Sequence, residues 1–178
     1  ARDPELPTWL DAGIVDDPTD YLDIRSVKIY GDGALGSRGA ALIEPYSDQP
    51  EQKGLLVTQP DKLTQIMQLT IAAGFQTNVH AIGDLANRLV LDRFEQLVPQ
   101  QQRAQSRHRI EHAQIVSPKD VTKDVVRQYI SFLTTMKQAK RSVSRKLAAL
   151  RRYFAWLVRD GKIKIDPTLG VRSPSDAG

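Results

Sequence analysis

The chain has 178 residues, a hydrophobic content of 40% and no cysteine. This composition can build one large or two small cores, and the lack of cysteine excludes disulfides and thiolate metal ligands. No run approaches the roughly 20 apolar residues of a membrane span, and no secretory leader is visible. We therefore expect a cytoplasmic protein with no membrane partner.

Charge divides the sequence into two parts of opposite sign. Residues 1–120 hold 12 Lys and Arg against 17 Asp and Glu, a net charge of −5. Residues 121–178 hold 13 against 4, a net charge of +9. A basic C-terminal part favours a polyanionic partner such as duplex DNA, and the alternative is an ordinary solvated helix surface.

The first elements are an irregular lead-in over residues 1–23 and a strand over Ile24–Tyr30. The strand is predicted from its alternation of β-branched and aromatic residues. A glycine-rich loop, Gly31–Gly39, follows it. Glycines in such a loop permit positive φ angles and close approach of the backbone. No Gly-Lys-Ser/Thr follows, so the loop is not a phosphate-binding P-loop.

Helices and strands then alternate. A helix is predicted from a Thr58 cap to Gly74, followed by a strand over Gln76–Ala81. A second helix begins with Asp84 as its cap and ends near Pro99.

The remaining elements are one strand and two helices. The strand is expected over His108–Val116, and a helix starts at Ser117 with Tyr129 and Met136 in its buried stripe. The last helix, Arg141–Asp160, has a clear apolar face. The order β-α-β-α-β-α-α predicts an α/β fold with a parallel sheet, followed by an all-α two-helix segment.

Two histidines occur in matching positions. His80 and His112 each follow a short apolar run and precede a polar turn, so each is expected at the carboxyl end of a strand. An α/β barrel builds metal sites from residues at these ends. Three strands cannot close a barrel of about eight, so two sheet edges would stay open unless a homo-oligomer covers them.

Three motifs give this part a family resemblance. Val27–Arg38, His80–Asp84 and His108–Gln114 resemble metal-dependent amidohydrolases of the branch that includes N-substituted formamide deformylase. The resemblance covers about residues 1–119 and implies part of a (β/α)₈ barrel that hydrolyses C–N bonds of small amides. It implies a divalent metal, zinc first, with Lys28, His80 and His112 as ligand positions.

This sequence lacks some of the residues that form the metal site in that family. With three histidines at positions 80, 108 and 112, no His-x-His pair is present, and the strand-eight aspartate has no counterpart. A catalytic zinc takes three protein ligands plus water. We therefore expect an incomplete active site, with no complete catalytic set and no activity by the chain alone.

The C-terminal part resembles a different family. Thr122–Ile130, Ser142–Phe154 and Leu157–Gly161 resemble the core-binding domain of tyrosine recombinases, the phage integrase family. The resemblance implies a chimera of two fragments, with domains at 1–119 and 120–178, and a DNA-binding module without catalysis as the alternative function. The basic residues expected to contact DNA phosphates are Arg141, Arg145, Lys146, Arg151 and Arg152.

Structural interpretations stand beside these functional ones. The two strand-end histidines can be hydrogen-bonded structural residues, and the helix arginines can be a solvated face. His108 is expected at the surface, and Asp32 and Asp84 as loop and cap residues. Glu111, next to a predicted ligand in a strand, is expected to point away from the metal face.

Overall fold

The computed structural model describes residues 4–19, 21–103 and 105–173. The chain divides into two compact units, residues 1–116 and 117–178, and each has its own cluster of buried apolar side chains. Among the described residues, no helix is both long enough and apolar enough to cross a lipid bilayer.

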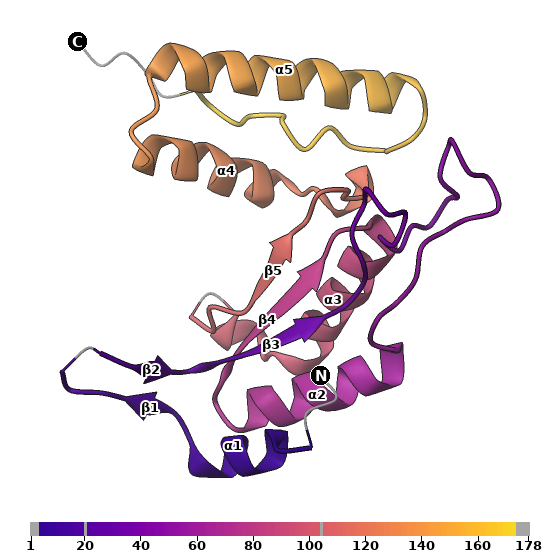
Figure 1. Cartoon of the computed structure of the whole chain (residues 1–178). Coiled ribbons are helices and arrows are strands. Elements are labelled where there is room, and N and C mark those ends of the chain that lie inside the picture. The colour runs from indigo at the N-terminus through magenta and orange to yellow at the C-terminus, as the bar shows by residue number, and fades with distance from the viewer. Residues whose placement is uncertain (1–3, 20, 104, 174–178) are drawn as a thin grey trace. The chain divides into compact units, whose positions relative to one another are not determined.

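The first unit is built on a three-stranded parallel sheet, as predicted. Its strands are β3 (Ser26–Tyr30), β4 (Gln76–Ala81) and β5 (Arg109–His112), in the order β3-β4-β5. The crossover helices are α2 (Pro60–Ala72) and α3 (Asp84–Leu97), as Figure 1 shows. A short 3₁₀ turn, η1 (Gln100–Gln102), follows α3.

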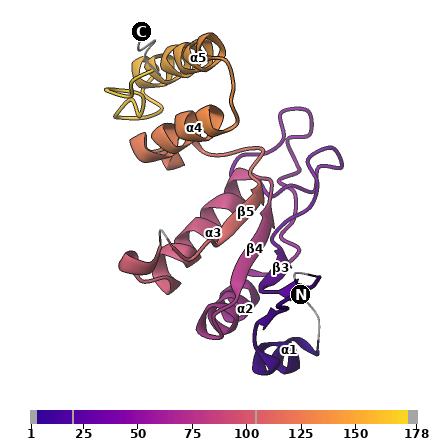
Figure 2. The same ribbon diagram turned by 90° about the vertical axis from the view of Figure 1, so that its left-hand side faces the viewer.

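Both helices cover the same face of the sheet, as Figure 2 shows. Ile29, Val79 and Ala81 point toward them and are fully buried. They pack against Met67 of α2 and Val90 of α3. Because side chains alternate along a strand, the residues between these apolar positions are placed on the opposite face.

The N-terminal lead-in has regular structure that we did not predict. It contains the helix α1 (Leu6–Ala12) and a two-stranded antiparallel sheet of β1 (Val15–Asp16) and β2 (Asp23–Ile24). The helix buries none of its residues, and each strand has two residues. Elements this short and this exposed need no apolar periodicity, so the sequence carries no signal for them.

Two predicted helix caps are wrong because both side chains make hydrogen bonds outside their own helix. The Thr58 hydroxyl donates to the carbonyl of Tyr30 at 2.7 Å, and α2 begins two residues later. Asp84 lies in the first turn of α3, and its carboxylate accepts a hydrogen bond from the backbone N–H of Ile43 at 2.9 Å. Both bonds attach loops to the carboxyl edge of the sheet.

The second unit is a pair of packed helices. The 3₁₀ turn η2 (Pro118–Asp120) precedes α4 (Lys123–Thr135) and α5 (Lys140–Arg159). Val126, Ile130, Leu133, Val143 and Leu147 form its core. The expectation of a buried stripe on α4 holds in part, since Tyr129 and Met136 are 38% and 60% exposed.

Candidate functional site

The uncovered face of the sheet is polar. The register pairs Lys28 with Asn78 and Tyr30 with His80, and it pairs His80 in turn with Glu111. All five therefore share one face by alternation. Glu111 was expected to point away from this face, and that expectation is wrong because the register sets Glu111 beside His80.

His80 and His112 come together at the carboxyl end of this face. Their ring centroids are 4.6 Å apart in an edge-to-face arrangement. His80 is the better buried of the two, with 13% of its side chain exposed, whereas His112 is exposed. Burial, and then the neighbouring His112, lower the pKa of His80, so its neutral form is favoured.

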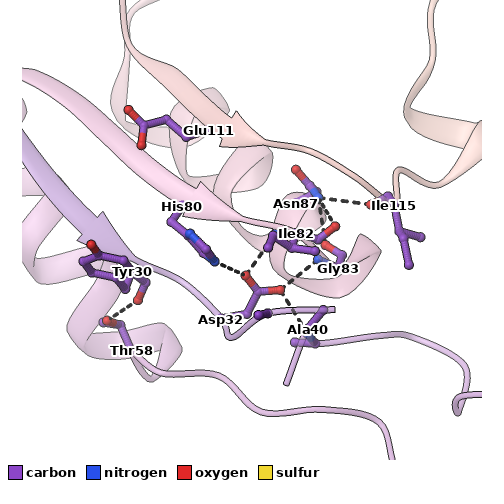
Figure 3. Close-up of polar contacts among 12 residues, drawn as sticks. Tyr30, Asp32, Ala40, Thr58, His80, Ile82, Gly83, Asn87, Glu111 and Ile115 are labelled. Carbon is purple, nitrogen blue, oxygen red and sulfur yellow. Dashed lines mark hydrogen bonds and ion pairs between the residues drawn. The ribbon is translucent and has the colours of Figure 1, made fainter. Parts of the chain in front are cut away.

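Asp32 fixes the environment of His80. Its buried carboxylate accepts hydrogen bonds from the backbone N–H groups of Ala41, Ile82 and Gly83 at 2.8 to 3.0 Å. One of its oxygens, Oδ1, lies 3.6 Å from Nε2 of His80, as Figure 3 shows. At this distance the contact is electrostatic and not a hydrogen bond, and Nε2 of His80 is buried without a hydrogen-bond partner among the described residues.

The sequence places Asp32 in a loop and does not predict its contact with His80. Its place between two glycines directly after a strand is the available signal. Gly31 must be glycine because a Cβ there would lie 2.8 Å from the carbonyl oxygen of His80. The chain therefore runs close to the end of β4, helped by the hydrogen bond from the Gly31 N–H to the same oxygen. This places the Asp32 carboxylate beside Ile82 and Gly83, which directly follow β4.

Lys28, the third predicted ligand position, lies on the same face in an ion pair with Glu111. Its ammonium also lies 5.3 Å from the centre of the Tyr30 ring. Burial, and secondarily the Arg109 guanidinium, lower the pKa of Lys28. Each partner of the ion pair is about a third exposed, so the pair contributes little to stability.

His108 takes no part in this cluster. Its ring stacks on Phe94 with centroids 5.4 Å apart, and Nδ1 accepts a hydrogen bond from the backbone N–H of Thr77 at 3.0 Å. Burial lowers its pKa. The expectation of a surface histidine is wrong in this respect, because the ring is partly buried and ties β5 to α3 and β4.

The side chains present fit part of a metal site. Two imidazoles 4.6 Å apart offer nitrogen donors of the type that zinc accepts. Among the described residues, no group of three or more His, Cys, Asp or Glu side chains is placed to hold an ion. Two imidazoles are one fewer than the three protein ligands that a catalytic zinc requires.

The predicted DNA-contacting residues lie on or near the surface of α5, in two groups. Arg151 donates to the carbonyl of Val171 at 2.7 Å, and Lys146 donates to the side chain of Gln138 at 2.8 Å. The other three have no ion pair among the described residues and are exposed: Arg141, Arg145 and Arg152.

Comparison with known proteins supports the first resemblance. The model of the amidohydrolase family matches residues 8–157. The chain is 39% identical over 100 residues to Protein LONG AFTER FAR-RED 3 of Arabidopsis thaliana, covering 56% of this chain and 17% of that protein. It is 39% identical over 97 residues to the Bacillus subtilis protein YtcJ, covering 54% and 18%.

The fold has a counterpart among solved structures. An uncharacterized metal-dependent hydrolase from Pyrococcus furiosus shares 34% sequence identity with a TM-score of 0.54, over 68% of this chain and 25% of that one. The chain thus spans about a fifth of the curated relatives and a quarter of the solved one. The family match continues past the boundary predicted after residue 119, and the recombinase resemblance stays a prediction.

Proposed function

This chain belongs to the amidohydrolase family, and from that membership we propose that it forms part of the metal site of a hydrolase acting on C–N bonds of small amides. The observation that carries the proposal is the adjacency of His80 and His112 at the ends of neighbouring parallel strands. Metal sites of α/β barrels lie at these ends.

The chain's own groups have distinct tasks in this proposal. One ring nitrogen of His80 and one of His112 would hold a divalent ion, with zinc the first choice for imidazole ligands. The Asp32 carboxylate, 3.6 Å from Nε2 of His80, would favour a proton on that nitrogen by charge and so leave the other ring nitrogen to the ion. When bound, such an ion supplies Lewis-acid polarisation of an amide carbonyl.

Lys28 is the conditional third ligand. Its ion pair with Glu111 keeps the ammonium on the face that carries His80. A lysine nitrogen binds metal or is carboxylated only after it loses its proton, and this would require separation from Glu111. With two imidazoles and a paired lysine, we expect weak metal binding and no amide hydrolysis by the chain alone.

Zinc titration of the purified chain by calorimetry tests the proposal. We expect binding that weakens about tenfold or more, equal to about 1.4 kcal/mol, in both His80→Asn and His112→Asn. The matched control is His108→Asn, which removes an imidazole from the same unit but outside the cluster. Equal loss in all three variants, or no zinc binding by the parent chain, would contradict the proposal.

DNA binding by the second unit is a separate candidate function. It rests on the three exposed arginines of α5 without ion pairs among the described residues: Arg141, Arg145 and Arg152. Phosphate contacts by such residues make affinity fall steeply with salt. A gel shift with duplex DNA at low salt, lost in the double variant Arg145→Glu with Arg152→Glu, would support it. Absence of a shift even at low salt would exclude it.

A further inference from the structure

The second unit contains a cavity outside the candidate metal site. It has a volume of about 730 Å³ and lies between the chain around η2 and the start of α4 on one side, and the segment after α5 on the other. A cavity of this size matches the usual range for small-molecule sites. Its apolar wall is formed by Val121, Ile163, Ile165, Pro167 and Leu169.

Two of these apolar residues are largely exposed to solvent. Ile165 is 76% exposed and Leu169 is 62% exposed. They follow a helix that already ends at Arg159, so no helical packing requires them. Large apolar side chains gathered at one place on a surface, with a polar border, mark binding sites more often than isolated ones do.

The border of the cavity is positively charged. Lys119, Lys123, Lys162 and Lys164 line it. Lys162 has a distant partner, with Nζ 3.9 Å from an Asp160 carboxylate oxygen. The other three lysines have no ion pair among the residues that the structure describes.

The acidic residue in the lining does not offset this charge locally. The Asp166 carboxylate accepts hydrogen bonds from the backbone N–H and the hydroxyl of Thr168, at 2.7 and 2.6 Å. Both bonds use Oδ1 and hold the carboxylate in a turn of its own segment. The lining therefore contains four lysines and one carboxylate, and that carboxylate is engaged in the turn.

We propose that this cavity binds a small amphiphilic anion, an alkyl or aryl body with one carboxylate, sulfonate or phosphate group. The apolar wall accommodates the body, and the lysines attract the acidic group. Lysine suits this role because its flexible stem delivers a point charge to acidic groups of different shapes. A nucleic-acid backbone fits less well, since it offers phosphates but nothing apolar for Ile165 and Leu169 to cover.

Calorimetric titration of the full chain with decanoate, below its critical micelle concentration, tests the proposal, with 1-decanol as the neutral probe. We expect decanoate to bind and decanol to bind at least about tenfold more weakly. The double variant Lys119→Gln with Lys164→Gln should lose that preference. The double variant Ile165→Gln with Leu169→Gln should weaken both ligands, and its two sites are exposed, so folding should be retained.

The control removes the same charge elsewhere in the unit, by Arg141→Gln with Arg145→Gln. It should leave decanoate affinity within about twofold, less than about 0.5 kcal/mol. An equal loss in this control would show general charge attraction and would overturn the proposal. Decanol binding as tightly as decanoate, or no decanoate binding at all, would also overturn it. Far-UV circular dichroism of every variant separates loss of the site from loss of the fold.

Discussion

The imidazole rings of His80 and His112 lie 4.6 Å apart, although the register gives the two residues opposite orientations in the sheet. His112 pairs with Ala81, whose side chain is buried against the helices. Regular alternation would turn His112 the same way. His112 instead has a φ of +81°, and this left-handed backbone at the end of β5 returns its ring to the polar face.

This relationship explains why the position of each histidine at a strand end predicted their proximity better than the alternation of side chains along the strand did. Both histidines could be placed at the carboxyl end of the sheet from the sequence. The left-handed backbone of His112 could not be predicted, because it occurs at a residue other than glycine. The error about Glu111 has the same cause, since alternation from a displaced neighbour assigns the wrong face.

Removing the charge of Asp32 should destabilise the first unit. In Asp32→Asn, the amide group would direct N–H donors at backbone N–H groups that now donate to the carboxylate. We expect a loss of about 2–3 kcal/mol in the free energy of unfolding, measured by urea denaturation, because buried bonds to a charged acceptor are among the strongest.

Asp48→Asn is the matched control for this variant. Asp48 is exposed and pairs with Arg38 at 2.7 Å, so solvent screens the interaction and little change is expected. Equal losses in the two variants would show that the three backbone bonds of Asp32 do not stabilise the loop.

The close packing of Gly83 gives a second prediction. A Cβ at this position would collide with the carbonyl of Ala41, on the loop that Asp32 holds against β4. The φ of Gly83 is −76°, so the cost in Gly83→Ala is steric and not conformational. We expect a loss of about 1–3 kcal/mol, the usual range for overpacking.

Gly36→Ala is the control for the loop. A Cβ at Gly36 would meet no atom within 4 Å, so thermal or urea unfolding should change little. Greater destabilisation by Gly36→Ala than by Gly83→Ala would contradict the close contact between the loop and the start of α3.

His108 should make the stability of the first unit depend on pH. Burial lowers its pKa below the ordinary value of 6.5, so the unfolded chain binds more protons than the folded chain as pH falls below that value. The stabilisation is fully present above about pH 6.5 and decreases as pH falls toward the folded-state pKa. Asn at this position can still accept the bond from Thr77, but it does not titrate.

The measurement is the difference in free energy of unfolding between the parent chain and His108→Asn, at pH 8 and at pH 5. The advantage of the parent chain should shrink at the lower pH. His80 is present in both proteins, so its own titration cancels in the difference. A difference that stays constant over this range would show that His108 does not titrate differently on folding.

How far the sequence predicted the fold depends on the kind of signal. The strand Gln76–Ala81 and the crossover helices followed from periodicity and are confirmed. The cap predictions failed because Thr58 and Asp84 bond to backbone groups that are distant in sequence, at Tyr30 and Ile43. The hydrogen bonds of Asp32 also join residues that are distant in sequence. Hydrophobic periodicity does not predict such contacts, so the sequence did not show that Asp32 holds the loop and lies beside His80.

The ends of α4 and α5 give the last prediction. Both helices end in the same pattern, in which the second residue after the cap donates to a carbonyl five residues earlier: Gln138 to Leu133, and Lys162 to Leu157. This pattern places the preceding residue in the left-handed region. That residue is Gly161 after α5, with φ of +72°, but Lys137 after α4, with φ of +54°.

Exchanging the two residue types should therefore have opposite effects. Lys137→Gly should stabilise the second unit by up to about 1 kcal/mol, because glycine removes the Cβ penalty but adds entropy to the unfolded chain. Gly161→Lys should destabilise it by about 1–2 kcal/mol, the usual cost of the left-handed conformation for a residue with a Cβ. Thermal unfolding followed by helical circular dichroism measures both. If both substitutions shift the midpoint in the same direction, the left-handed backbone at these two positions is not the cause of the shifts.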